Sequence, residues 1–170
     1  HKLIEMGARV VTVSDSSGYV VDEEGIDGEK LAFIKRLKNI RRGRISEYAE
    51  QYPQATYTPA DPAQDGNPLW HHRAQCAFPC ATQNEIGKAD AYHLINNNVK
   101  LVCEGASMPC TTDAQEIFID KGILYAPSKA ANAGGVAVSG LELTQNSIRL
   151  SWLGEEVDNR LQIIMKGIHD

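Results

Sequence analysis

Phe78-Pro-Cys-Ala-Thr-Gln-Asn-Glu85 is a short apolar stretch that runs directly into three neutral polar side chains. A strand that ends in Thr-Gln-Asn presents hydrogen-bond donors and acceptors at its carboxyl end. Open α/β sheets hold their ligands at the carboxyl ends of their strands. The segment therefore predicts a buried strand followed by a polar loop that faces a ligand.

Two further segments repeat this design. The apolar run from Val99 to Cys103 opens into the small polar loop Glu104-Gly-Ala-Ser-Met-Pro109. Residues 129–142, Lys-Ala-Ala-Asn-Ala-Gly-Gly-Val-Ala-Val-Ser-Gly-Leu-Glu, join small side chains to one amide, one hydroxyl and a glycine pair that lets another group approach the backbone. We expect these loops to form one ligand site, although the last segment also fits a plain glycine-rich turn between a strand and a helix.

Strand-like and helix-like segments alternate along the chain. Asp27 is a candidate helix cap, and Thr112 with Gln115 forms a capping-box pattern. Residues 53–69 are rich in Pro, Gly, Asp and Gln and are predicted to form a loop. The expected strands are 8–14, 76–79, 99–103 and 123–126, and the expected helices are 31–40, 45–52, 86–97, 113–120 and 157–168. This alternation predicts an α/β fold with a parallel sheet covered on both faces by helices.

The composition of the chain argues against several classes of protein. The chain of 170 residues fits one domain, and its net charge of −5 argues against general nucleic-acid or anionic-membrane binding. No apolar stretch approaches the roughly 20 residues that a membrane helix needs, and no signal-like start is present. The four cysteines lack the paired spacing of a zinc site, and His71-His72 has no matching ligand pattern. We therefore expect no metal, and reduced thiols in a cytoplasmic protein.

Five segments carry a resemblance to a known family and follow one another in the family's order. They are residues 13–20, 37–45, 78–85, 104–109 and 125–142. On these segments the chain resembles the coenzyme-binding domain of the hexameric, NADP-using glutamate dehydrogenases of bacteria, fungi and protists. The resemblance implies a Rossmann-like, doubly wound and mostly parallel α/β fold with helices on both faces.

The resemblance also implies that residues 1–170 are a partial dinucleotide-binding domain. The first strand, the G-x-G-x-x-G fingerprint and a separate N-terminal catalytic domain are expected to lie outside this sequence. The family's catalytic lysine and aspartate belong to that other domain, so no catalytic residue is assigned here. We expect residues 1–170 alone not to catalyse, and we expect the whole protein to be a cytoplasmic homohexamer.

The adenosine end of the coenzyme is assigned by resemblance to Ser14, Asp15, Ser16 and Lys38. An acidic residue at the end of the second strand usually selects NAD, and Asp15 fits that pattern. However, residues 14–18 resemble the serine-rich loop of the NADP-type enzymes, in which the serine at the position of Ser16 contacts the 2′-phosphate and the acidic residue turns aside. Lys38, with Arg41 and Arg42, is a candidate cation for this phosphate, and the alternative is a solvated helix end. NADP is therefore favoured over NAD.

The nicotinamide end is assigned to the polar strand-end loops. By resemblance, Ala81, Thr82, Gln83 and Asn84 lie against the nicotinamide ribose. Asn132 hydrogen-bonds the carboxamide, a role that suits an amide because it both donates and accepts. Ser107 stands where many relatives have Asn, and Ser128 where Gly is common.

Substrate recognition is assigned to Val136 and Ser139. By resemblance, Ser139 donates to the distal carboxylate of glutamate, and Val136 lines the pocket for the methylene groups. The alternative for Ser139 is a small residue that allows close helix packing. The implied reaction interconverts glutamate and NADP with 2-oxoglutarate, ammonia and NADPH. Two other functions stay open: a branched-chain or aromatic amino-acid dehydrogenase, and a non-catalytic nucleotide-binding module.

Overall fold

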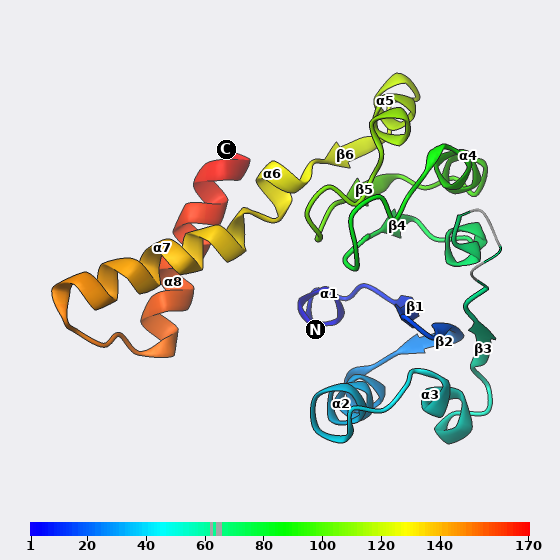
Figure 1. Ribbon diagram of the computed structural model, residues 1–170, viewed down its shortest axis with the longest axis horizontal. Coiled ribbons are helices and arrows are strands. Elements are labelled where there is room, and N and C mark those ends of the chain that lie inside the picture. The colour runs from blue at the N-terminus through cyan, green and yellow to red at the C-terminus, as the bar shows by residue number, and fades with distance from the viewer. Residues whose placement is uncertain (62, 64–65) are drawn as a thin grey trace. The chain divides into compact units, whose positions relative to one another are not determined.

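Two three-stranded sheets organise the chain, one in each of two units, His1–His72 and Arg73–Asp170. The computed structural model in Figure 1 describes residues 1–61, 63 and 66–170. Among these described residues no helix is both long and apolar enough to cross a membrane. The α/β class predicted from the sequence is confirmed. The sheet of the first unit is antiparallel, and the sheet of the second unit is parallel.

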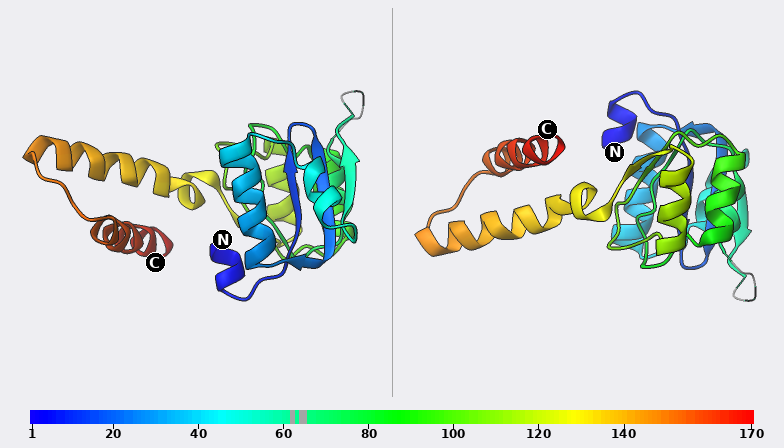
Figure 2. Two further views of the ribbon diagram at one scale, coloured as in Figure 1. Left: turned by 90° about the horizontal axis from the view of Figure 1, so that it is seen from below. Right: turned by 90° about the horizontal axis from the view of Figure 1, so that it is seen from above.

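The first unit is built on an antiparallel sheet. After the short helix α1 (Lys2–Glu5), strand β1 (Val10–Asp15) pairs with β2 (Gly18–Ile26), which pairs in turn with β3 (Thr56–Pro59). Helices α2 (Gly28–Arg36) and α3 (Ser46–Gln51) lie on the same side of this sheet, as Figures 1 and 2 show. A π-helical turn over Leu37–Arg41 continues α2. The core beneath these helices consists of Val20, Ile26, Ile45, Tyr48 and Ala55.

The second unit is built on a parallel sheet, as the sequence predicts. Its strands β4 (Cys76–Ala77), β5 (Leu101–Cys103) and β6 (Leu124–Ala126) pair in sequence order. Helices α4 (Lys88–Asn96) and α5 (Thr112–Asp120) cover one face of it (Figure 2). The parallel register brings the carboxyl ends of all three strands to one edge.

Three helices end the second unit. Helix α6 (Ser128–Ala131) leads into α7 (Ala133–Ile148), which pairs with α8 (Gly154–His169), and the pair extends away from the sheet in Figure 1. None of the three helices contains a buried residue. The glycine-rich run 129–142 is therefore largely helical rather than a turn. Gly134 faces α8: a Cβ there would lie in ordinary van der Waals contact with the Met165 sulfur, at 3.6 Å.

Three local predictions were wrong. The hairpin β1–β2 was missed because residues 14–18 were interpreted as a strand-end loop, whereas Ser16 and Ser17 form a two-residue turn. The stretch 53–69 holds β3 and a 3₁₀ helix, Pro68–His71, as well as loop; its residues 62, 64 and 65 lie outside the described part. Helix α5 is capped by Thr111, whose side chain accepts from the Ala114 N–H, and not by Thr112.

One polar network lies inside the first unit. Asp22 is fully buried and accepts hydrogen bonds from the Tyr48 hydroxyl at 2.6 Å and the Lys30 ammonium at 2.9 Å. Burial acts to raise the pKa of Asp22, but the hydrogen bonds from Tyr48 and Lys30 outweigh it and lower the pKa below its usual value. Because the three side chains belong to β2, α2 and α3, this carboxylate joins both helices to the sheet.

We expect Asp22→Asn to lower the free energy of unfolding by about 2–4 kcal/mol, because an amide leaves one buried donor unpaired. Urea unfolding measures this change, and Glu23→Gln at the exposed neighbouring position is the matched control. Since the folded pKa of Asp22 is lowered, the advantage of the wild type is complete above about pH 4 and decreases as the pH falls further. Equal unfolding curves for the two variants at pH 7 would contradict the role given to Asp22.

Candidate functional site

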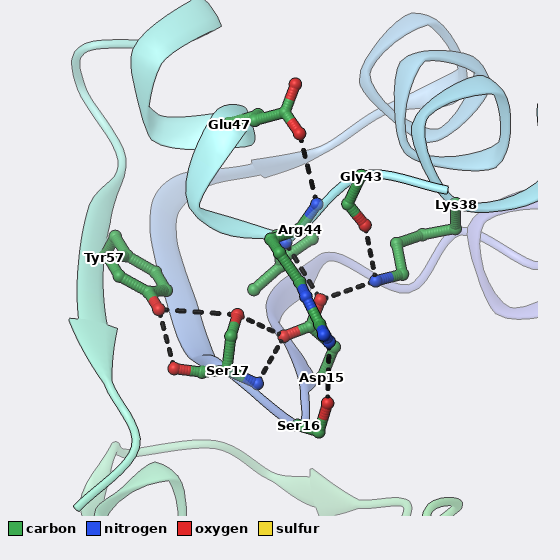
Figure 3. A network of polar contacts seen from close by, with 9 residues as sticks. Asp15, Ser16, Ser17, Lys38, Gly43, Arg44, Glu47 and Tyr57 are labelled. Atoms are coloured by element: carbon green, nitrogen blue, oxygen red, sulfur yellow. Dashed lines mark hydrogen bonds and ion pairs between the residues drawn. The ribbon is translucent and has the colours of Figure 1, made fainter. Parts of the chain in front are cut away.

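The turn between β1 and β2 is organised by the carboxylate of Asp15 (Figure 3). One oxygen accepts from the Ser17 N–H at 2.8 Å and the Ser17 hydroxyl at 2.6 Å. The other accepts from the Lys38 ammonium at 2.5 Å and the Ile45 N–H at 2.9 Å. Partial burial acts to raise the pKa of Asp15, but the hydrogen bonds from Lys38 and Ser17 outweigh it and hold the pKa well below its usual range. Asp15 is thus engaged within the protein.

The exposed side of the same turn carries a hydroxyl and a guanidinium. The Arg44 Nη1 donates to the Ser16 hydroxyl at 2.9 Å, and both residues are exposed (Figure 3). No carboxylate among the described residues lies within ion-pair distance of the Arg44 side chain. Ser14 is exposed on β1 beside them. A guanidinium next to a hydroxyl is well suited to bind a phosphate group, because both supply donors from a fixed geometry.

Two of the three cations named from the sequence, Lys38 and Arg41, have partners within the protein. Lys38 is held by Asp15 and by the Gly43 carbonyl oxygen at 2.9 Å, and Arg41 pairs with Glu47 at 2.6 Å. Arg42 is exposed and has a left-handed backbone, φ 57°. Arg44, which sequence reasoning missed, is the residue that reaches Ser16. It belongs to the segment 37–45 and directly follows Gly43, a break after the helix that could have drawn attention to it.

The strand-end loops of the second unit form one cluster, made of residues 79–86, 104–110 and 126–132 and here called the strand-end cluster. The Pro79 carbonyl oxygen accepts from the N–H groups of Gly105 and Ala106 at 3.0 and 3.1 Å. The Asn84 N–H donates to the Met108 carbonyl oxygen at 3.0 Å. These bonds tie the loop after β4 to the loop after β5, so the two polar loops lie side by side; that they share a ligand stays a prediction.

The polar side chains of the first loop face outward. Ala81, Thr82, Gln83 and Asn84 are all exposed. The carboxylate of Glu85 accepts from the Ala81 and Thr82 N–H groups at 2.9 and 3.3 Å and so closes the loop. Burial raises the pKa of Glu85 more than these two hydrogen bonds lower it.

The third loop joins the cluster through side chains. Asn132 donates from Nδ2 to the Ser107 hydroxyl at 3.4 Å, so the two residues assigned to the nicotinamide lie together. The Met108 N–H donates to the Ser128 hydroxyl, also at 3.4 Å. Ser107 and Ser128, the two departures noted in the sequence, therefore both form contacts between loops.

The two residues assigned to the substrate lie on α7. Val136 has 78 % of its surface exposed, and the Ser139 hydroxyl donates to the Gly135 carbonyl oxygen of its own helix at 3.2 Å. Their spacing of three residues puts both on the same side of the helix. The exposure of this side leaves the hydroxyl and the valine accessible to a ligand.

Cys80, Cys103 and Cys110 lack the lowered pKa that is typical of a reactive thiol. Burial raises the pKa of the Cys80, Cys103 and Cys110 thiols, and the nearby Glu85 and Glu104 carboxylates act in the same direction. Across the described residues, the structure places no group of three or more His, Cys, Asp or Glu side chains where they could hold a metal ion.

A parallel sheet whose polar strand-end loops gather at one edge places the second unit in the class of α/β domains that hold ligands at the carboxyl ends of their strands. The model of one family, described as "Glutamate/Leucine/Phenylalanine/Valine dehydrogenase", matches residues 1–170. The chain belongs to this family.

Individual relatives agree with the assignment. The chain is similar to an NAD(P)-specific glutamate dehydrogenase of Xylanibacter ruminicola, with 55 % identity over 168 residues, which are 99 % of this chain and 36 % of the relative. It is 50 % identical over 168 residues to the NADP-specific glutamate dehydrogenase of Escherichia coli strain K12, again covering 99 % and 36 % of the two chains. The crystal structure of Plasmodium falciparum glutamate dehydrogenase matches with a TM-score of 0.89 and 44 % identity, over 98 % of this chain and 34 % of that one. The chain thus spans about a third of the length of these relatives.

The turn that carries Ser16 requires a glycine at position 18. Gly18 has φ 152°, and a Cβ there would meet the Thr58 carbonyl oxygen and lie 2.9 Å from the Pro59 Cα. We expect Gly18→Ala to lower the free energy of unfolding by about 3 kcal/mol, because both obstacles are backbone atoms. Thermal unfolding measures the loss. Gly28→Ala, where a Cβ meets nothing within 4 Å, is the control and should be close to neutral; similar losses in the two variants would refute the steric argument.

Proposed function

We propose that this chain is the coenzyme-binding part of a glutamate dehydrogenase that interconverts glutamate with 2-oxoglutarate and ammonia and uses NADP(H). Family membership and the names of the relatives support the reaction class. The observation that carries the coenzyme assignment is the pairing of Arg44 with Ser16 on the exposed side of a turn whose one carboxylate, Asp15, is engaged internally.

The adenosine end of the coenzyme is bound in this proposal by the β1–β2 turn. A 2′-phosphate accepts hydrogen bonds from the Ser16 hydroxyl and the Arg44 guanidinium, and Ser14 lies beside them. Asp15 does not accept from a ribose hydroxyl, because four donors of the protein already surround its two oxygens. Lys38 adds positive charge but acts chiefly by holding Asp15. The relatives' names include NADP-specific, NAD(P)-specific and NAD-specific enzymes, so the family alone does not decide between the coenzymes.

The nicotinamide end is bound in this proposal by the strand-end cluster. Thr82, Gln83 and Asn84 offer exposed polar side chains to the ribose, and the exposed Ala81 lies beside them. The Asn132 amide, with one N–H directed to Ser107, keeps its oxygen and its second N–H for the carboxamide. The nicotinamide, when bound, supplies the hydride chemistry; these residues supply its position and orientation.

Substrate binding falls to Ser139 and Val136 on α7. The Ser139 hydroxyl turns from the Gly135 carbonyl oxygen to donate to the distal carboxylate of glutamate, and Val136 packs against the methylene groups. A hydroxyl at this position favours a dicarboxylate over a branched or aromatic side chain, because an unpaired donor is costly in a closed site.

The proposal extends to the whole protein. We infer that residues 1–170 are one part of a dinucleotide-binding domain and that the reacting lysine and aspartate belong to polypeptide outside them. A homohexamer and a cytoplasmic location complete the proposal, on the strength of the resemblance of the five segments.

The proposed reaction is tested with the longest natural polypeptide that carries residues 1–170. We expect rapid oxidation of NADPH, followed by its absorbance, when ammonium and 2-oxoglutarate are both present. NADH in place of NADPH, and a branched 2-oxo acid in place of 2-oxoglutarate, should give lower kcat/KM values. A folded protein that binds NADPH but turns over no substrate would support a non-catalytic nucleotide-binding module instead.

Arg44→Ala tests the coenzyme assignment in the same assay. Loss of one charge-assisted hydrogen bond costs about 1.5–3 kcal/mol, so kcat/KM for NADPH should fall about 10- to 100-fold while kcat/KM for NADH changes little. The dependence of NADPH binding on salt should also decrease. Arg36→Ala, at an exposed position on α2, is the matched control and should leave both coenzymes unaffected. An equal decrease of kcat/KM for NADPH and for NADH would show that Arg44 does not contact the 2′-phosphate.

Ser139→Ala tests the substrate assignment. We expect kcat/KM for 2-oxoglutarate to fall about tenfold, with a smaller effect on a branched 2-oxo acid, because only the dicarboxylate loses a donor. Thr144 offers a close control: it lies on the same helix, and its hydroxyl donates to the Gly140 carbonyl oxygen at 2.9 Å, just as Ser139 donates to Gly135. If Thr144→Ala changes substrate preference as much as Ser139→Ala does, the effect belongs to the helix and not to substrate contact.

A further inference from the structure

Glu104 is a carboxylate that sits inside the strand-end cluster, with 1 % of its surface exposed. Its Oε2 accepts from the Ser128 N–H at 2.6 Å, and its Oε1 accepts from the Cys110 N–H at 3.2 Å. Burial acts to raise its pKa, but the nearby Tyr125 hydroxyl and the two N–H groups outweigh this and lower the pKa below its usual value. The group is therefore held as a charged acceptor.

The two N–H groups belong to different loops. Cys110 ends the loop that carries Ser107, and Ser128 is the first residue of α6, the helix that leads to Asn132. The Glu104 N–H also donates to the Ala126 carbonyl oxygen at 3.0 Å, so residue 104 is attached to the end of β6 through its backbone as well. One side chain thus fixes the spacing between Ser107 and Asn132, whose own contact is long and exposed at 3.4 Å.

We propose that Glu104 is a positioning residue for the nicotinamide end of the coenzyme, acting by holding the Ser107 loop and the start of α6 together so that the Asn132 amide keeps its orientation. The proposal rests on the proposed function and deepens it. Glu104 itself does not contact the coenzyme, because its carboxylate is buried and engaged by backbone donors. Glu104 and all the residues that it positions belong to the second unit.

The chemistry requires a carboxylate at this position. The Ser128 and Cys110 N–H groups and the nearby Tyr125 hydroxyl can all donate to this side chain, and a carboxylate is the group that offers two acceptor oxygens and no donor. Glutamine has nearly the same size, but its NH₂ group would face one of the two N–H donors and leave it unpaired in a buried place. Glu104→Gln therefore loosens one loop without changing the volume of the site.

The experiment compares two ligands on the full polypeptide. Adenosine 2′,5′-bisphosphate contains the adenosine end of NADPH and lacks the nicotinamide, whereas NADPH has both ends. For Glu104→Gln we expect the Kd of NADPH to rise about tenfold and kcat to fall, while the Kd of adenosine 2′,5′-bisphosphate stays within about twofold of the wild type. Glu116→Gln on α5 makes the same chemical change at an exposed position and should alter neither Kd.

Each outcome has a defined meaning. Equal weakening of both ligands would indicate general destabilisation, and an unchanged Kd for NADPH would show that the loops keep their spacing without Glu104; either result overturns the proposal. If Glu104→Gln does not fold, Glu104→Asp replaces it: the shorter carboxylate reaches one donor at a time, so NADPH alone should bind about threefold more weakly, and an unchanged Kd again overturns the proposal. A wild-type protein that binds neither ligand would refute the proposed function itself, before Glu104 is tested.

Discussion

Three carboxylates with little access to water hold helices, loops and a turn of this protein in place. A desolvated charge has to be met by donors, and in a small fold those donors come from several elements at once. Asp22 collects a hydroxyl from α3 and an ammonium from α2, and Glu104 collects backbone N–H groups from two loops. Asp15 does the same for the turn between β1 and β2. In each case an unpaired donor or acceptor would cost free energy. The donors therefore stay close to the carboxylate, and the elements that carry them are held in place.

The parallel half of the fold could be predicted from the sequence because its signals are local. Short apolar runs that end in polar residues mark β4 and β5, and the cluster of their loops follows from the parallel register. The antiparallel half could not be predicted in this way. Ser16 and Ser17 have the composition of either a ligand-binding loop or a tight turn, and the pairing of β2 with β3 depends on residues some 40 positions apart in the sequence. Such non-local pairing leaves no periodic signal.

The candidate site shows a similar division. The resemblance directed attention to Ser16, Asn132 and Ser107, and the structure brings the last two together. It gave no indication that Asp15 and Lys38 are engaged with each other, because an ion pair between a turn and a helix depends on tertiary geometry. Arg44 was missed for the same reason: it lies just before α3, and its contact with Ser16 joins residues 28 positions apart in the sequence. The sequence does not show which partner a charged side chain contacts, so the roles of Asp15, Lys38 and Arg44 could not be predicted from it.

The arrangement of the β1–β2 turn also has an evolutionary consequence. The groups that hold the turn, Asp15 with its four donors, are distinct from the exposed pair, Ser16 and Arg44. Substitutions at exposed positions outside such networks usually change stability by less than about 0.5 kcal/mol. The exposed pair can therefore mutate while the turn keeps its shape, and under the proposed coenzyme role a change of coenzyme preference needs no compensating change in the scaffold. If this pair binds the 2′-phosphate as proposed, a few surface mutations would be enough to change the coenzyme preference; the relatives' names include NADP-specific and NAD-specific enzymes.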